Sequence, residues 1–461
     1  MRQQACGQLQ GSKVVIKKGA EIAQKYGKNM ITYVGPFPFL VTTDPEVVRD
    51  VMTSKLSIDK PSLLYDGFSN GIGEGLISLQ GNHWSKNRKV FNVPFKIGSL
   101  LQFMKIFNKK ANDLIEKCDN DIESGKNTHL IYFLREMSFS IAMETVIGRR
   151  FGPDEVDLKN YVERCALGME YVGELASNFI YLNCFIRKLA KMTIYKEASN
   201  MIDFLSNFLK ESLDNYKNLR GTDPSYLENT NTIMEHVDKA MQENKYDGKD
   251  AVPDLMHVFV GSFESTAATI YFTFILLAMH PDIQQQAYEE ICNILPNDID
   301  GESEVTYKDT NQMVYLDMIV NEVWRLFPVI PTIGREVTGG NLTLSNGVVL
   351  PKGQRIMIDI YNLHHSKEIW GADADKFNPD NFLPANVENR HPFAFIPFAK
   401  GIRNCIGMRY AEMTVKVSLT KCLKRYKFSS NARMEDLVCE NHVVLQMVKF
   451  PHMTIERRKK S

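Results

Sequence analysis

The sequence has no surplus of charge, which removes the usual indication of a nucleic-acid-binding protein. Its 461 residues include 55 Lys and Arg and 55 Asp and Glu, so the formal net charge is zero. Nothing in this balance predicts an interaction with nucleic acid. With 44% hydrophobic and 24% charged residues the chain can bury a large core, which excludes a mostly disordered or collagen-like protein.

Cysteine is too sparse for a disulfide scaffold, and its spacing does not predict a zinc ribbon or a dithiol redox site. No two cysteines are spaced as Cys-x-x-Cys. We expect most of them to be buried, reduced thiols, with one exception that is described below. The cysteines are Cys6, Cys118, Cys165, Cys184, Cys292, Cys405, Cys422 and Cys439.

Long apolar runs are also missing from the sequence. Met1–Asn29 is polar and basic and has no apolar core of a signal peptide, so we expect no N-terminal membrane anchor in this chain. The most apolar stretch elsewhere, Ala267–Met279, is shorter than the roughly 20 residues that cross a bilayer. It is apolar on nearly all sides, which predicts a buried core helix.

The order of expected elements indicates a mainly α protein. We expect a short helix at Lys18–Tyr26 and two strands, Met30–Val34 and Phe39–Thr42, separated by a turn. Asp44-Pro45 has the cap-plus-proline signature of a helix start. Helical patterns then dominate from Trp84 to Leu326.

The C-terminal part of the chain has a different pattern of predicted elements. Leu342–Val349 predicts a small hairpin around Asn346-Gly347, and Phe377–Pro397 predicts an ordered stretch that is neither helix nor strand. Met408–Tyr426 returns to helix, and Asp214–Asp250 is polar enough to form helix ends and surface loop. There are no repeats, so we expect a single domain over residues 1–461, mainly α with a minor antiparallel β part.

The segment from Phe398 to Gly407 carries the strongest chemical signal. It holds Gly401, Arg403 and Cys405 just before a predicted helix. Free N–H groups and the helix dipole at such a position stabilise a thiolate, which makes Cys405 a candidate metal ligand. Arg403 can pair with a carboxylate. Taken alone, a buried thiol beside a glycine turn explains the same residues more often.

The pattern Phe-x-x-Gly-x-Arg-x-Cys-x-Gly resembles the signature of the cytochrome P450 family, the haem-thiolate monooxygenases, and all of its fixed positions match. The resemblance implies the cytochrome P450 fold. It also implies that Cys405 is the axial thiolate ligand to the iron of heme b, in a site that includes Phe398, Arg403 and Gly407. The chain most resembles microsomal members from animals, especially insects, in the branch that includes fatty-acid ω-hydroxylases.

Glu322 and Arg325, at positions i and i+3, resemble the family's Glu-x-x-Arg helix. Alone, such a pair is usually solvated and contributes little. The resemblance implies a buried pair that shapes the haem-binding core. Its usual third member is an arginine, and Asn381 stands in that place here, which leaves the third contact open.

A second motif lies on the predicted buried helix, where Glu264 is followed by Ser265 and Thr266. Without the resemblance, Ser and Thr hydroxyls bonded back to i−4 carbonyls are the preferred interpretation. The family motif implies that these residues are catalytic and deliver protons to iron-bound oxygen. Ser265 replaces the usual Thr, and some relatives link haem covalently through a Glu at the position of Gly261, so no ester link is expected here.

Trp84 and Arg88, at i and i+4, form either a surface amphipathic patch or, by resemblance, part of the haem site. The family uses this Trp and Arg on haem propionates, and Arg335 matches another propionate-binding position. Together with Arg403, three arginines would face two buried carboxylates, which need such partners.

Two segments allow two interpretations each. The cations around Trp84 and the cysteine helix form either a solvated face or a docking surface for an acidic redox partner. Ser177–Arg187 is either a packed helix face or, by family position, an access-channel loop that dips into a membrane. The cations are Lys86, Lys89, Lys400, Arg409 and Lys416.

The resemblance implies a monooxygenase that inserts one atom of O2 into a small apolar substrate such as an insect hormone, a fatty acid or a foreign compound. Electrons would come from an NADPH-cytochrome reductase, with cytochrome b5 as a second donor. The implied location is the cytoplasmic face of the endoplasmic reticulum (microsome) membrane, bound peripherally. The alternatives are a haem-thiolate isomerase or dehydratase that needs no external electrons, and an inert haem-binding protein.

Overall fold

The computed structural model describes residues 25–126, 128–149, 158–177, 179–222, 232–296, 303–442 and 444–458. Within these residues the chain forms two compact units. Unit 1 comprises Met1–Pro61, Asn321–Arg403 and Asn431–His452; unit 2 comprises Ser62–Val320, Asn404–Ser430 and Met453–Ser461. The helix expected at Lys18–Tyr26 lies almost wholly outside the described residues. A single domain over residues 1–461 stays a prediction.

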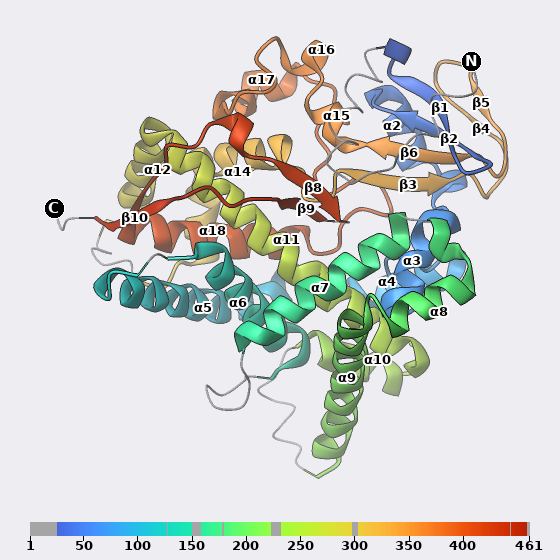
Figure 1. Cartoon of the computed structure of the whole chain (residues 1–461), viewed down its shortest axis with the longest axis horizontal. Helices are drawn as coiled ribbons and strands as arrows, with labels where there is room; N and C mark the ends of the chain where they lie inside the picture. The colour runs from blue at the N-terminus through green and yellow to red at the C-terminus, as the bar shows by residue number, and fades with distance from the viewer. Residues whose placement is uncertain are drawn as a thin grey trace. The chain divides into compact units, whose positions relative to one another are not determined.

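The main sheet belongs to unit 1 and joins strands from distant parts of the sequence (Figure 1). Its order is β1 (Asn29–Val34), β2 (Phe37–Thr42), β6 (Arg355–Asp359) and β3 (Thr332–Glu336). β1 and β2 form the expected antiparallel hairpin, and β3 is antiparallel to β6. β2 pairs with β6 in parallel, so the minor β part, expected to be antiparallel, includes one parallel pair.

Helix α2 (Pro45–Thr53) begins where Asp44-Pro45 predicts it. The Asp44 side chain accepts from the backbone N–H of Glu46, and Pro45 occupies the first turn, where its missing N–H costs nothing. The apolar face of α2, including Val48 and Val51, belongs to a core cluster with Ile356 and Ile358 of the sheet. Burial of this face therefore anchors α2 in the core of unit 1.

The rest of unit 1 consists of short elements. β4 and β5 make the hairpin expected around Asn346-Gly347, with φ of 85° at Gly347. Phe377–Pro397, expected to hold neither helix nor strand, contains two short helices and is otherwise irregular. These elements are η1 (Lys55–Ser57), β4 (Leu342–Thr343), β5 (Val349–Leu350), α15 (Ile360–His364), α16 (Lys367–Trp370), η6 (Pro379–Phe382), α17 (Pro384–Glu388), η7 (Met434–Asp436), β8 (Cys439–His442) and β9 (Val444–Met447).

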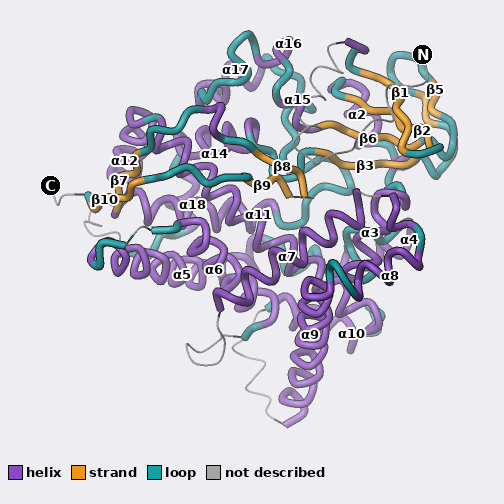
Figure 2. Tube along the Cα trace, viewed as in Figure 1, coloured by secondary structure: helices purple, strands orange, loops and turns teal. Residues whose placement is uncertain are grey.

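Unit 2 is mostly helical, as the purple tube in Figure 2 shows. It is composed of α3 (Ser62–Ile72), α4 (Gly81–Phe91), α5 (Ile97–Glu123), α6 (Leu130–Ala142), η2 (Met143–Ile147), α7 (Leu158–Ser177), η3 (Phe179–Leu182), α8 (Cys184–Met192), α9 (Lys196–Thr222), α10 (Ile233–Gln242), η5 (Gly248–Asp250), α11 (Ala251–Met279), α12 (Pro281–Ile294), α13 (Tyr307–Gln312), α18 (Met408–Arg425), β7 (Tyr426–Ser429) and β10 (Thr454–Arg457). α14 (Val314–Leu326) begins in unit 2 and ends in unit 1.

Helix α11 is the core helix of unit 2, and α6, α9 and α18 pack against it. It has 29 residues, so the apolar stretch Ala267–Met279 is only its second half. Among the described residues, Gly248–Met279 is the one helical segment long and apolar enough to cross a bilayer, but 83% of its most apolar window is buried inside the protein. The prediction of a buried core helix is confirmed, in a longer helix than the sequence suggested.

The described cysteines follow the expectation only in part: they are free thiols, but most of them are not buried. None of the seven described cysteines forms a disulfide, and Cys118, Cys165 and Cys422 are buried. Burial raises the pKa of Cys422 to about 12, so it stays a neutral thiol. Cys184 and Cys405 are the exposed ones.

Candidate functional site

The loop before α18 exposes the Cys405 thiol at the start of a helix. α18 begins at Met408 with Gly407 as its N-cap residue, so the sulfur lies just outside the first turn. A Cβ at Gly407 would come within 3.9 Å of both Cys405 Sγ and the Phe95 ring. The structure therefore surrounds the thiol with little side-chain bulk and leaves it accessible, unlike the inert cysteines of the core.

Gly401 shapes the part of this loop that lies in unit 1. Its φ is 74°, and a Cβ there would lie 2.0 Å from the Met52 carbonyl oxygen. Only glycine tolerates both the backbone conformation and the close approach. The loop is thus held against the C-terminal end of α2 by a contact that no other residue type allows.

Arg403 and Phe398 are fixed within unit 1. Arg403 is buried, and its Nε donates to the Ile58 carbonyl at 3.1 Å. The half-buried Phe398 ring packs edge to face on Trp324, with ring centroids 4.7 Å apart. Both loop residues therefore have a defined orientation.

Arg88 ties α4 to the cysteine loop within unit 2. Its Nη2 donates to Asn404 Oδ1 at 3.1 Å, directly before Cys405, and its Nε donates to Asn92 Oδ1 at 2.9 Å. Burial lowers the pKa of Arg88, and the nearby Cys405 opposes this shift. Trp84, one turn earlier, is buried, so the two residues are not a surface patch. A cation beside Cys405 favours its thiolate form.

Arg335 lies on β3 of unit 1 and is only 2% exposed. Its Nη1 donates to the Gly334 carbonyl at 2.8 Å. A guanidinium carries five N–H donors and keeps its charge even when buried, so this position suits the binding of an anion.

Glu264 is buried in α11 and forms an ion pair with Arg135 of α6. Arg135 Nε and Nη2 donate to Glu264 Oε1 at 3.0 and 2.6 Å. A second link between the same helices runs from Ser138 Oγ to the Phe263 carbonyl at 2.7 Å. Glu264 could be identified from the sequence and Arg135 could not, because an isolated arginine on an amphipathic helix carries no local signal.

The two hydroxyls after Glu264 are bonded within the helix. Ser265 Oγ donates to the Gly261 carbonyl and Thr266 Oγ1 to the Ser262 carbonyl, both at 2.7 Å. This is the i−4 bonding that general helix chemistry predicts. Gly261 is exposed, in a helix that is otherwise largely buried, so α11 has a local opening beside the Ser265 hydroxyl.

Comparison with known proteins decides the family. Residues 6–452 match the family model described as Cytochrome P450. The chain belongs to the cytochrome P450 family. It is 37% identical over 442 residues to probable cytochrome P450 313a4 of Drosophila melanogaster, covering 94% of this chain and 87% of the relative. It is 28% identical over 451 residues to cytochrome P450 4c21 of Blattella germanica, covering 95% and 87%.

Cytochromes P450 are haem-thiolate monooxygenases, so this chain uses haem, whose iron takes a cysteine thiolate, together with O2, an organic substrate and a redox partner. The residues present fit such a group. Cys405 offers an accessible sulfur in unit 2, and Arg88 in unit 2 and Arg335 and Arg403 in unit 1 are partly or fully buried cations, the kind of partner that propionate charges need. Within the described residues no cluster of three His, Cys, Asp or Glu side chains offers a competing metal site.

The Glu322–Arg325 pair of this P450 is fully buried, unlike the solvated pair that the two residues alone would predict. Arg325 Nε and Nη2 donate to the two Glu322 oxygens, both at 2.7 Å, and Nη1 donates to the His364 and Ala374 carbonyls. Asn381, which replaces the usual arginine, donates its Nδ2 to Glu322 Oε1 at 3.1 Å. The amide therefore supplies the third contact that the sequence left open.

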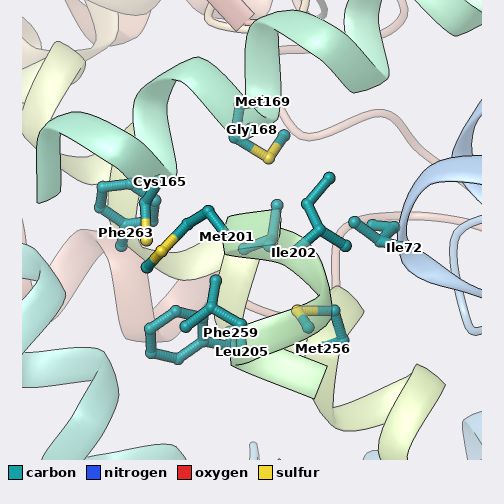
Figure 3. Close-up of a pocket in the computed structure, with 11 residues that line it drawn as sticks. Ile72, Cys165, Gly168, Met169, Met201, Ile202, Leu205, Met256, Phe259 and Phe263 are labelled. Atoms are coloured by element: carbon teal, nitrogen blue, oxygen red, sulfur yellow. The ribbon is translucent and has the colours of Figure 1, made fainter. Parts of the chain in front are cut away.

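A small apolar cavity of about 10 Å³, room for about one water molecule, lies between α7, α9 and α11 of unit 2, as Figure 3 shows. Sulfur-containing side chains reach it from all three helices, including Cys165, Met201 and Met256. Burial and the charge of Glu264 raise the pKa of Cys165, so the thiol is neutral and acts as part of the apolar lining. Flexible methionines adapt to ligands of different shape. This lining was not predicted, since its residues are far apart in the sequence.

Proposed function

We propose that Cys405 is the axial ligand of the haem iron in this cytochrome P450. The observation that carries the proposal is the accessible Cys405 thiol next to Gly407, with Arg88 bonded to the adjacent Asn404. Bound haem with a thiolate ligand supplies the chemistry that splits O2 and inserts one oxygen atom into a substrate.

Trp84, Arg88, Arg335 and Arg403 would hold the haem propionates, with Phe398 and Gly407 adjoining the cysteine loop. The support is that buried carboxylates require cationic or hydrogen-bonding partners, and the three arginine side chains are already fixed by backbone or amide contacts. Held in advance, they lose little conformational entropy on binding.

Glu264, Ser265 and Thr266 would deliver protons beside the opening at Gly261. Glu264 is held by Arg135 and cannot hand on a proton in this arrangement. Proton delivery therefore requires Glu264 to leave Arg135, while the Ser265 hydroxyl, bonded to the Gly261 carbonyl, rotates toward the open face. Arg135 thus controls how often the acid is available.

The substrate would be a small apolar molecule, with an insect hormone, a fatty acid or a foreign compound as the candidates. Support comes from the apolar, methionine-rich lining between α7, α9 and α11, whose flexible side chains would have to move apart to admit a substrate. The electron donor would be an NADPH-cytochrome reductase, with cytochrome b5 as a second donor. Lys86, Lys89 and Arg409 are exposed and suit an acidic partner.

Two of the cations predicted to form the docking surface are buried or half-buried. Lys416 is buried, where its Nζ donates to the Thr310 carbonyl at 2.8 Å and pairs with Asp317, so it belongs to the core. Lys400 is half-buried and bonded to the Pro392 carbonyl.

Peripheral binding to the endoplasmic reticulum membrane is supported by α8 and the segments beside it. Phe185 is 73% exposed and Met192 is 72% exposed, and Leu189 between them is exposed as well. Side chains of this size in one exposed helix are unusual for a water-facing surface and suit the lipid interface. They argue against the alternative of a packed helix face at Ser177–Arg187.

The test is a CO-difference spectrum of the reduced chain and two cysteine variants. We expect the thiolate-type Soret band in the wild type and in Cys184→Ala, the matched control at another exposed cysteine, and its loss in Cys405→Ala with loss of haem. A normal band in Cys405→Ala would refute the assignment. Turnover that needs no NADPH and no reductase would point to an isomerase or dehydratase, and haem that is never reduced would point to an inert haem-binding protein.

A further inference from the structure

A buried polar cluster joins α4 to the beginning of α11 in unit 2. Asn87 of α4 is only 3% exposed. Its Nδ2 donates to Asp254 Oδ2 at 2.8 Å and to Asp250 Oδ2 at 3.1 Å, so both amide hydrogens are used. His83, one turn earlier on α4, contacts the same Asp250 oxygen through Nε2 at 2.6 Å.

Tyr246 completes the cluster from the segment before α11. Its hydroxyl donates to Asp254 Oδ2 at 2.6 Å, and its ring packs edge to face on Phe91 of α4, with centroids 6.0 Å apart. Asp254 therefore accepts from Asn87 and from Tyr246 on one oxygen. The same aromatic side chain that holds the acid also packs against the end of α4.

The position of Asn87 within α4 links the cluster to the residues proposed to hold haem. Asn87 directly precedes Arg88 and follows Trp84 by one helical turn. Neighbouring positions on a helix turn together, so a bond that fixes Asn87 also fixes the rotation of α4 about its axis. That rotation sets the direction of Arg88, which reaches Asn404 beside Cys405.

Both carboxylates that share the Asn87 amide are buried, Asp254 more completely than Asp250. Asp254 has no exposed surface, and burial raises its pKa to about 7. The charge of Asp250 raises this pKa as well, whereas the hydrogen bonds from Tyr246 and Asn87 and the backbone of Leu76 lower it. Asp254 is thus an acid that changes charge near neutral pH.

The other charged and titratable groups around the cluster are already engaged. The exposed Lys249 pairs with Asp247 at 3.0 Å. His257, one turn after Asp254 on α11, accepts from the Ile77 N–H at Nδ1 and donates from Nε2 to the Gly73 carbonyl. Because Nδ1 accepts, the His257 ring is neutral in this arrangement and adds no charge beside Asp254.

We propose that Asn87 is a positioning residue for the haem-binding helix α4, and that its link to Asp250 and Asp254 loosens when Asp254 loses its proton. The role of α4 in holding haem rests on the proposed function; the link itself does not. When Asp254 is protonated, the two carboxyl groups share the Asn87 amide without repelling each other. When Asp254 loses its proton, two buried carboxylates repel each other, and opening of α4 relieves the repulsion by admitting water.

The direction of the effect follows from proton linkage. An exposed Asp has a pKa of about 3.9, so the closed state binds more protons than an open state in which Asp254 is hydrated. Opening of α4 therefore increases as pH rises between these two values and levels off above the pKa of the buried acid. One proton is involved, so the increase is at most about tenfold per pH unit.

The first experiment measures the rate of amide hydrogen exchange in α4, followed in peptides from Gly81–Phe91. The full chain is used as purified, and wild type is compared with Asp254→Asn at the same pH. The comparison at equal pH cancels the intrinsic pH dependence of exchange. We expect the wild-type-to-variant rate ratio to rise at least about threefold from pH 5.5 to 7.5, since Asn cannot ionise but keeps an oxygen for Tyr246 and Asn87. Asp247→Asn, an exposed change in the same segment, should behave as wild type.

A second readout is the rate of haem transfer from the loaded enzyme to excess apomyoglobin. We expect Asn87→Leu to release haem at least about tenfold faster than wild type, because both carboxylates lose their shared donor. Tyr246→Phe removes a donor that lowers the Asp254 pKa, so it should move the pH profile upward. This variant keeps the test valid if Asn87→Leu does not fold.

The outcomes separate the two proposals. A flat rate ratio in exchange, or Asn87→Leu with wild-type exchange in α4, would overturn the inference. The expected exchange pattern together with haem release that does not change would keep the pH-dependent link and refute its role in positioning the haem helix. A chain that takes up no haem would contradict the proposed function, and the exchange experiment would still decide the link.

Discussion

The ion pair between Arg135 and Glu264 allows a quantitative test of how unit 2 holds its proposed proton donor. Arg135→Met removes both hydrogen bonds to Glu264 and keeps most of the apolar length of the side chain. The Glu264 side chain is only 2% exposed, and that of Arg135 is 13% exposed, so water does not replace the lost partner. Breaking a buried ion pair lowers the free energy of unfolding by about 3–5 kcal/mol. Because Arg135 is slightly exposed, we expect a loss of about 3 kcal/mol.

The assay is urea unfolding of the haem-loaded enzyme followed by circular dichroism, for the single variants and for Arg135→Met combined with Glu264→Gln. We expect the double variant to recover about 1–2 kcal/mol relative to Arg135→Met, because the buried charge is removed together with its partner. Lys245→Met is the control, since the Lys245–Glu243 pair is exposed and its loss should cost under about 1 kcal/mol. A cost for Arg135→Met no larger than that of Lys245→Met would refute the reasoning.

Three further predictions concern single side chains. Arg325→Met leaves the fully buried Glu322 without its guanidinium, and we expect a loss of at least about 3 kcal/mol in urea unfolding together with poor haem retention. Gly401→Ala places a methyl group against the Met52 carbonyl, so we expect a thermal unfolding midpoint lower by several degrees, whereas Gly98→Ala, in open space on α5, should change it little. Phe185→Ser on the exposed face of α8 should reduce flotation with phospholipid vesicles at least about threefold, and unchanged flotation would contradict the membrane surface.

Features that depend on neighbouring residues could be predicted from the sequence. Asp44-Pro45 starts a helix because a side-chain acceptor and a fixed φ act within one turn, and Asn346-Gly347 makes a hairpin for similar local reasons. The segment before α18 could also be predicted, because its glycines and the place of Cys405 just before the helix depend on only a few neighbouring residues.

Features that depend on tertiary packing could not be predicted. Arg135 meets Glu264 across 129 positions, and Asn87 meets Asp254 across 167 positions, so no local pattern marks either pair. The sequence predicts Lys416 as a surface cation, but its ammonium group lies in the core, bonded to a carbonyl. In each case the partner, and not the residue type, decides whether a polar side chain is exposed.

The parallel pairing of β2 with β6 has a consequence for synthesis of the chain. Phe39 lies opposite Arg355, so 316 positions must be made before the central pair of the sheet can form. At about 5–20 residues per second, a ribosome needs roughly 15–60 s for that length. During this time the β1–β2 hairpin carries an unpaired, apolar edge, which invites wrong strand partners. The nascent protein is therefore expected to depend on chaperones until its last third emerges.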